Sequence, residues 1–155
     1  MGRPCFCLAF FHREGKALPL PPAGAQIAPL TYNKSMDHGF DDGIRLFNSR
    51  KYFEAHEALE AVWLKTEGDR KLFLHGLIQI AAAFHHHGRG NPAGCRSLLE
   101  KGLRKLERFG RVESGIDLMG LRDQLQPWRD YLEDRKRAQP AHPPLPRILK
   151  AIASV

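Results

Sequence analysis

The chain has 155 residues, of which 43% are hydrophobic, and this is enough for one domain with a buried core. Its formal net charge of +7 favours an anionic partner, but its Lys and Arg residues alternate with apolar positions, as on solvated helix faces. Its three cysteines are too few for a disulfide framework, and no apolar run reaches about 18 residues, so we expect a cytoplasmic protein without a membrane span.

Composition divides the chain into three parts. Residues 1–35 contain five of the eleven prolines and lack helical periodicity. We expect them to form a disordered or non-native N-terminal extension, with Met36 as an alternative start of the natural protein. Residues 36–138 form the predicted helical bundle domain. Residues 139–155 form a proline-rich tail, in which Ile148, Leu149 and Ile152 are spaced to dock on the bundle.

Apolar residues recur at helical spacing in six segments after the N-terminal extension. The predicted helices cover residues 37–48, 52–66, 69–87, 91–109, 117–125 and 127–137. Asp69, Asn91 and Asp117 are the predicted N-caps, and Pro127 is expected to separate the last two helices. Strand patterns are nearly absent, and short connections make successive helices antiparallel. The sequence therefore predicts an all-α fold, a single bundle of five or six antiparallel helices that resembles a stack of helical hairpins.

Two long motif blocks, residues 40–63 and 73–94, are similar to those of a known family. Their signature positions are Gly43, Phe47, Asn48, Tyr52, Phe53, Trp63, Gly76 and Gly90. Together the blocks resemble domain-of-unknown-function family three hundred and nine, a group of small, mostly bacterial helical proteins. The resemblance covers about residues 38–110. It implies an all-helical bundle but no activity, because none is assigned to the family.

Several polar residues occupy positions where the predicted core is apolar. On the second predicted helix, His56 and Glu60 are one turn apart on the flank of the apolar face. The third helix is apolar on nearly every side, so we expect it to be buried, and its polar exceptions fall within a strip about 40° wide. The strip consists of His75, Gln79 and His86. Because the two helices are predicted to be antiparallel neighbours, we expect the flank to face the strip.

Three hypotheses explain this polar cluster, to which Glu57 and Asn91 also belong. In the first, the side chains only satisfy one another's hydrogen bonds, as buried polar groups need to, and Asn91 caps a helix. In the second, a divalent cation is bound in the cluster and activates water for hydrolysis. Its candidate residues are His56, Glu57, Glu60 and His86, with His56, Glu60 and His86 as metal ligands. The spacing lacks the second histidine of the H-E-x-x-H zinc motif.

In the third hypothesis, the helical hairpins present a groove to a protein or peptide. RNA is less favoured, because most aromatic residues are predicted to be buried. The candidate contacts for an acidic partner are Arg45, Arg50, Arg89 and Arg104. The chain has no nucleophile elbow and no phosphate-binding glycine loop. We therefore expect a non-catalytic binding or scaffold module with a His/Glu/Gln cluster in its core, and a metal-dependent hydrolase as the alternative.

Overall fold

The computed structural model of the chain describes the backbone of residues 34–133 and 141–151. Within these residues the protein has five helices and one short hairpin, so the predicted all-α bundle is confirmed. The helices are α2 (Lys34–Asn48), α3 (Tyr52–Trp63), α4 (Gly68–Gly88), α5 (Pro92–Leu106) and α6 (Leu118–Glu133), and the hairpin strands are β1 (Val112–Glu113) and β2 (Ile116–Asp117). The predicted N-terminal extension lies outside the described residues, except that its last two residues belong to α2.

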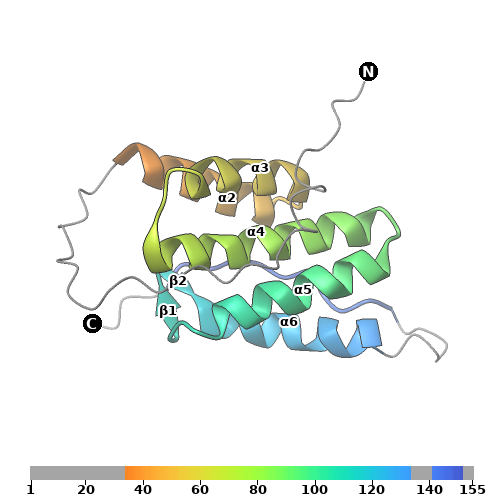
Figure 1. Cartoon of the computed structure of the whole chain (residues 1–155). Coiled ribbons are helices and arrows are strands. Elements are labelled where there is room, and N and C mark those ends of the chain that lie inside the picture. The colour runs from red at the N-terminus through yellow and green to blue at the C-terminus, as the bar shows by residue number, and fades with distance from the viewer. Residues whose placement is uncertain (1–33, 134–140, 152–155) are drawn as a thin grey trace, which may run out of the picture. The chain divides into compact units, whose positions relative to one another are not determined.

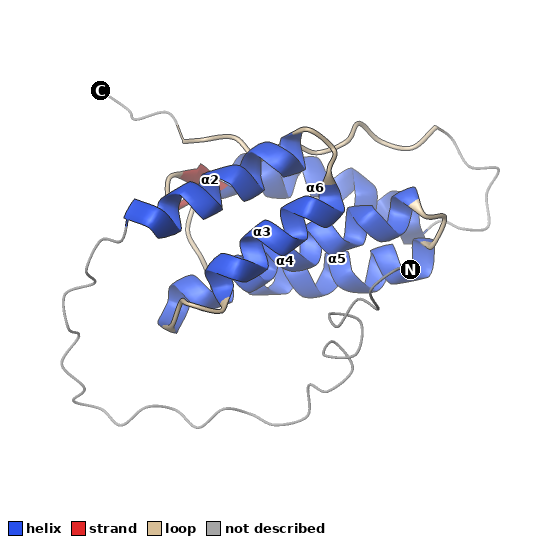
Figure 2. Cartoon of the chain, turned by 90° about the horizontal axis from the view of Figure 1, so that it is seen from above, coloured by secondary structure: helices blue, strands red, loops and turns tan. Residues whose placement is uncertain are grey.

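The helices pack in two layers: the α2–α3 hairpin packs on α4, mainly through α3, and α5 and α6 belong with α4 to the second layer (Figure 1). The view from above in Figure 2 shows α2 and α3 in front of the other three helices. Glycines allow the closest approaches. A Cβ atom on Gly43 of α2 would lie 2.6 Å from Cγ of Leu59 on α3, and one on Gly76 of α4 would lie 2.8 Å from Cδ2 of Leu106 on α5. Both signature glycines therefore set the distance between neighbouring helices.

An aromatic cluster around Phe84 of α4 joins the two layers. The ring centroid of Phe84 lies 6.2 Å from that of Phe47 on α2, 5.5 Å from that of Tyr52 on α3 and 5.0 Å from that of Trp128 on α6. Phe47, Phe84 and Trp128 are almost completely buried. Side chains from four helices thus share one core, and α4 is its central element.

One continuous helix spans α6, so the prediction that Pro127 divides it is wrong. A proline inside a helix removes one N–H and clashes with the preceding turn, at a cost of about 3 kcal/mol. Pro127 lies on the exposed face of α6, and the opposite face is buried at helical spacing. That buried face consists of Leu118, Leu121, Leu125, Trp128 and Leu132. Burial of these side chains outweighs the loss of one hydrogen bond.

Two of the three predicted N-caps are confirmed. Oδ1 of Asn91 accepts a hydrogen bond from the Gly94 N–H at 2.9 Å, and Oδ1 of Asp117 accepts one from the Gly120 N–H at 3.0 Å. Asp69 does not cap α4, because that helix begins one residue earlier. Asp69 lies in the first turn instead, where a negative charge interacts favourably with the helix dipole.

Candidate functional site

The predicted polar strip on α4 does not face a single neighbour, because its three residues contact different elements. The ring centroid of His75 lies 5.7 Å from that of Trp63 on α3. Gln79 is fully buried, and its Oε1 accepts a hydrogen bond from Nζ of Lys105 on α5 at 3.1 Å. Nδ1 of His86 lies 3.1 Å from the side-chain nitrogen of the N-cap of α5. The strip therefore lies at the border between α3 and α5.

His56 is the most buried polar residue of the α3 flank, with 5% of its surface exposed. Burial lowers the pKa of His56, and the carboxylates of Glu60 and Glu57 partly oppose this shift. Among the residues that the structure describes, two buried atoms of the cluster, Nδ1 of His56 and Nε2 of Gln79, are without a hydrogen-bond partner, and so is Nε1 of the adjacent Trp63. A buried polar atom without a partner costs about 1–3 kcal/mol. The polar cluster is therefore not a closed hydrogen-bond network.

The residues of the metal hypothesis do not meet at one point. Within residues 38–133 and 141–151, no group of three or more His, Cys, Asp or Glu side chains is placed to hold a metal ion. Glu57 is exposed on α3, and His86 contacts the start of α5. A hydrolytic metal site needs about three convergent protein ligands. The structure therefore does not support the metal-dependent hydrolase that the sequence offered as the alternative.

The four arginines predicted to contact an acidic partner are all exposed: Arg45, Arg50, Arg89 and Arg104. Arg45 is paired with Asp42 one turn away, with a distance of 2.8 Å between Nη2 and Oδ1. The others lie in the α2–α3 connection, directly after α4, and on α5. The structure therefore does not gather these arginines on one element.

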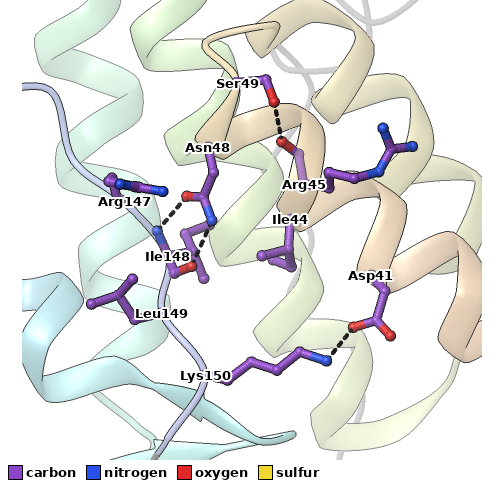
Figure 3. Close-up of a pocket in the computed structure, with 9 residues that line it drawn as sticks. All are labelled: Asp41, Ile44, Arg45, Asn48, Ser49, Arg147, Ile148, Leu149 and Lys150. Carbon is purple, nitrogen blue, oxygen red and sulfur yellow. Dashed lines mark hydrogen bonds and ion pairs between the residues drawn. The ribbon is translucent and has the colours of Figure 1, made fainter.

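An extended segment, residues 141–151, returns along the bundle and contacts α2 and α6 (blue in Figure 1). Asn48, the last residue of α2, bonds both backbone groups of Ile148 (Figure 3). Its Oδ1 accepts a hydrogen bond from the Ile148 N–H at 2.8 Å, and its Nδ2 donates one to the Ile148 carbonyl at 2.8 Å. The Asn48 side chain thus forms with Ile148 the pair of backbone hydrogen bonds that a neighbouring strand would form in a sheet.

Gln124 of α6 bonds the neighbouring residue in the same way. Its Oε1 accepts a hydrogen bond from the Arg147 N–H at 2.8 Å, and its Nε2 donates one to the Arg147 carbonyl at 3.1 Å. Nε2 also donates to the Gly120 carbonyl within α6 at 3.0 Å, which fixes the orientation of the amide. Consecutive residues of an extended chain direct their backbone groups to opposite sides. We call the pair that holds the segment from both sides, Asn48 and Gln124, the amide clasp.

After the amide clasp, the segment continues along the hairpin. The Leu149 carbonyl accepts a hydrogen bond from the Asp117 N–H at 2.9 Å, and the Ala151 N–H donates one to the Gly115 carbonyl at 2.8 Å. The segment also forms an antiparallel bridge with β2. These contacts, like those of the amide clasp, use backbone atoms of the segment. They are therefore independent of its side chains.

Alternate side chains of the segment point toward the bundle. Pro146 and Ile148 are buried, with Ile148 only 1% exposed, whereas Leu149 between Ile148 and Lys150 is 50% exposed. Nζ of Lys150 lies 3.1 Å from Oδ1 of Asp41 on α2, and both side chains are exposed. A surface hollow of about 580 Å³ lies between α2 and residues 147–150 (Figure 3). The predicted docking of Ile148 is confirmed, Leu149 is half exposed, and Ile152 lies outside the described residues.

Trp128 of α6 contacts the first half of the segment. Its Nε1 donates a hydrogen bond to the Pro144 carbonyl at 2.9 Å. The His142 ring stacks on the indole, with an interplanar angle of 23° and 5.6 Å between centroids. His87 of α4 meets the indole edge-on, with 4.7 Å between centroids. His87, which falls outside the predicted polar strip, therefore supports the residue that binds the segment.

Sequence reasoning identified Asn48 only as a signature position and missed Gln124 and Trp128 as contacts of the tail. The sequence signal for these contacts is that two amide side chains stand next to core positions. Asn48 follows the buried Phe47, and Gln124 precedes the buried Leu125. A half-buried amide needs both a donor and an acceptor as partners. An extended backbone without a partner strand supplies both.

The fold and the amide clasp define a small helical protein that holds an extended segment against its bundle. Residues 40–98 match the family described as "Domain of unknown function (DUF309)", which confirms the resemblance predicted from the sequence. A relative in Bacillus subtilis (strain 168), "Uncharacterized protein YpuF", is 38% identical over 71 residues. That match covers 45% of this chain and 41% of the relative.

The family match includes the polar cluster and one half of the amide clasp. It spans the end of α2, all of α3 and α4, and the first half of α5, so it contains Asn48 but neither Gln124 nor the C-terminal segment.

In the described part of the chain, no helix has both the length and the apolar character to cross a lipid bilayer.

Proposed function

We propose that the protein is a non-catalytic binding module that holds an extended peptide segment between α2 and α6. The observation that carries this proposal is the amide clasp, in which Asn48 and Gln124 each bond the N–H and the carbonyl of one residue of the segment. Recognition of an extended peptide through its backbone is a recurrent mode of protein binding, with pockets for alternate side chains. The partner is thus a protein or peptide, within the class expected from the sequence.

The contacts of the site support binding in trans as well as in cis. The backbone bonds at residues 147, 148, 149 and 151 are available to any extended segment without proline at 147, 148 and 151, because each uses an N–H or a carbonyl. In this proposal, the C-terminal segment is the intramolecular occupant of the site. A tethered segment has an effective concentration on the order of 1 mM, so an external peptide competes poorly until the segment is released.

The polar cluster has a supporting role in this proposal. Gln79 bonds Lys105 across the α4–α5 interface, and His75 contacts Trp63 across the α3–α4 interface. These contacts fix the relative positions of α3, α4 and α5. Phe84 of α4 in turn packs on Trp128, which binds the segment. The cluster therefore stabilises the scaffold on which the peptide site is built.

The test uses the full-length chain with the substitution Ile148→Asp, which places a carboxylate at a position that is 1% exposed and so releases the segment. A fluorescein-labelled peptide with the sequence of residues 141–151 is titrated against this variant, and its anisotropy is recorded. We expect saturable binding below about 1 mM peptide. If Ile148→Asp does not fold by circular dichroism, Ile148→Ser is the milder substitution at the same position.

The matched control is Leu149→Asp, which introduces the same charge one residue later, at a position that is 50% exposed. This variant keeps its segment in place, so it and the wild-type chain should bind the labelled peptide at least tenfold more weakly than Ile148→Asp. Absence of saturable binding to a folded Ile148→Asp chain would overturn the proposal, because the site would then hold the segment only as a fixed part of the fold.

A further inference from the structure

We infer that the ligand of this site is a proline-rich extended peptide with an aliphatic residue two positions after a proline. This inference rests on the proposed peptide-binding function and names its class of partner. The amide clasp alone accepts any extended backbone that has an N–H at both clasped residues, so further selectivity has to come from the side chains that the site buries. The segment that occupies the site shows which side chains these are.

The two buried side chains of the clasped stretch belong to Pro146 and Ile148, at a spacing of two residues. This spacing is that of an extended chain, in which every second side chain points to the same side. Ile148 is 1% exposed, and its neighbour Leu149 is 50% exposed. The site therefore selects a branched aliphatic side chain at the position of Ile148 and tolerates other side chains at the position of Leu149.

Prolines fit the part of the site that holds residues 143–146, because the hydrogen bond to the backbone there is accepted by a carbonyl and needs no N–H of the segment. Nε1 of Trp128 donates to the Pro144 carbonyl, whereas the described backbone N–H donors of the segment are those of residues 147, 148 and 151. Proline has no N–H, so a proline at 143, 144 or 146 leaves no donor unsatisfied. Proline-rich chains are also extended before they bind, which lowers the entropy lost on binding.

Charge contributes less to this recognition. Lys150 and Asp41 form the one ion pair between the segment and α2 among the described residues, and both side chains are more than half exposed. Exposed pairs of this kind are screened by salt and stabilise little. The ligand class is thus set by proline and the aliphatic residue, and a lysine two positions further on adds a minor contact.

A peptide panel tests this inference on the folded Ile148→Asp chain. The reference peptide has the sequence of residues 141–151, and its variants carry Ile148→Ala, Pro146→Ala or Leu149→Ala. A scrambled peptide of the same composition controls for binding by net charge. We expect Ile148→Ala to raise the Kd by about tenfold or more, since it removes a fully buried side chain. Leu149→Ala is expected to change the Kd less than about twofold, and Pro146→Ala to raise it about threefold to tenfold.

The outcomes separate the inference from the function on which it rests. Equal Kd values for the reference, Ile148→Ala and scrambled peptides would overturn the ligand class but leave the peptide-binding function standing, because the backbone alone would then be read. Failure of every peptide to bind, the reference included, would overturn both. A loss confined to Ile148→Ala, Pro146→Ala and the scrambled peptide would support the inferred class.

Discussion

Replacing Asn48 with alanine removes both hydrogen bonds that hold Ile148, each 2.8 Å long. A hydrogen bond of this kind contributes about 0.5–1.5 kcal/mol net, so we expect the substitution to weaken attachment of the segment by about 1–3 kcal/mol. Hydrogen exchange of the Ile148 amide measures this attachment directly. Because 1.4 kcal/mol corresponds to a factor of ten, the Ile148 N–H should exchange about 5- to 150-fold faster in Asn48→Ala than in the wild-type chain.

The control for this measurement is Asn91→Ala, which removes a different side-chain amide from the end of a helix. Asn91 caps α5, so Asn91→Ala should lower the free energy of unfolding by about 1 kcal/mol. Asn91 makes no described contact with the segment. Exchange at Ile148 should stay unchanged, because the segment opens without unfolding of the bundle. An equal rate at Ile148 in Asn48→Ala and in the wild type would refute the reasoning, since other contacts would then hold the segment.

Three further predictions concern the interior of the bundle. Trp128→Phe keeps an aromatic ring but removes the donor to the Pro144 carbonyl, so urea unfolding should show a loss of about 1 kcal/mol, against about 3–5 kcal/mol for Trp128→Ala. Burial lowers the pKa of His56, so as the pH falls below about 6.5 this histidine is protonated in the unfolded chain before it is protonated in the folded one. The free energy of unfolding should therefore drop between pH 7 and pH 5. The same dependence of the free energy of unfolding on pH in His56→Gln would contradict this. Burial raises the pKa of the Cys95 thiol to about 12, so in a chain whose other cysteines are serine a thiol reagent should react only after urea unfolding, and fast labelling of the native chain would be inconsistent with this burial.

Local sequence signals were sufficient for the helices from α2 to α5. The Asn91-Pro92 pair fixed the start of α5, and the nearly continuous apolar sequence of α4 predicted its burial. Local sequence signals were insufficient at Pro127, where the preference of proline against helix is outweighed by burial of the α6 face that includes Trp128. Local propensity fails there because packing with the rest of the bundle decides the outcome.

The polar strip shows a second limit of sequence reasoning. Helical spacing placed His75, Gln79 and His86 on one side of α4, but α4 has neighbours on two sides, and the strip lies between them. The angle around one helix does not identify the helix that it meets. The amide clasp lies further beyond such reasoning, because Asn48 and Ile148 are 100 residues apart in the sequence.

The side-chain amide signals of Asn48 and Gln124 in a nitrogen-15 NMR spectrum test the central claim most directly. In the full-length Ile148→Asp chain, release of the segment leaves both amides without their partners at residues 147 and 148, and Gln124 keeps only its bond to the Gly120 carbonyl. Titration with the unlabelled peptide of residues 141–151 should return both signals to their wild-type positions, because the peptide re-forms the four bonds of the amide clasp. Signals that stay at their starting positions, or shifts confined to other residues while the peptide binds, would contradict the account.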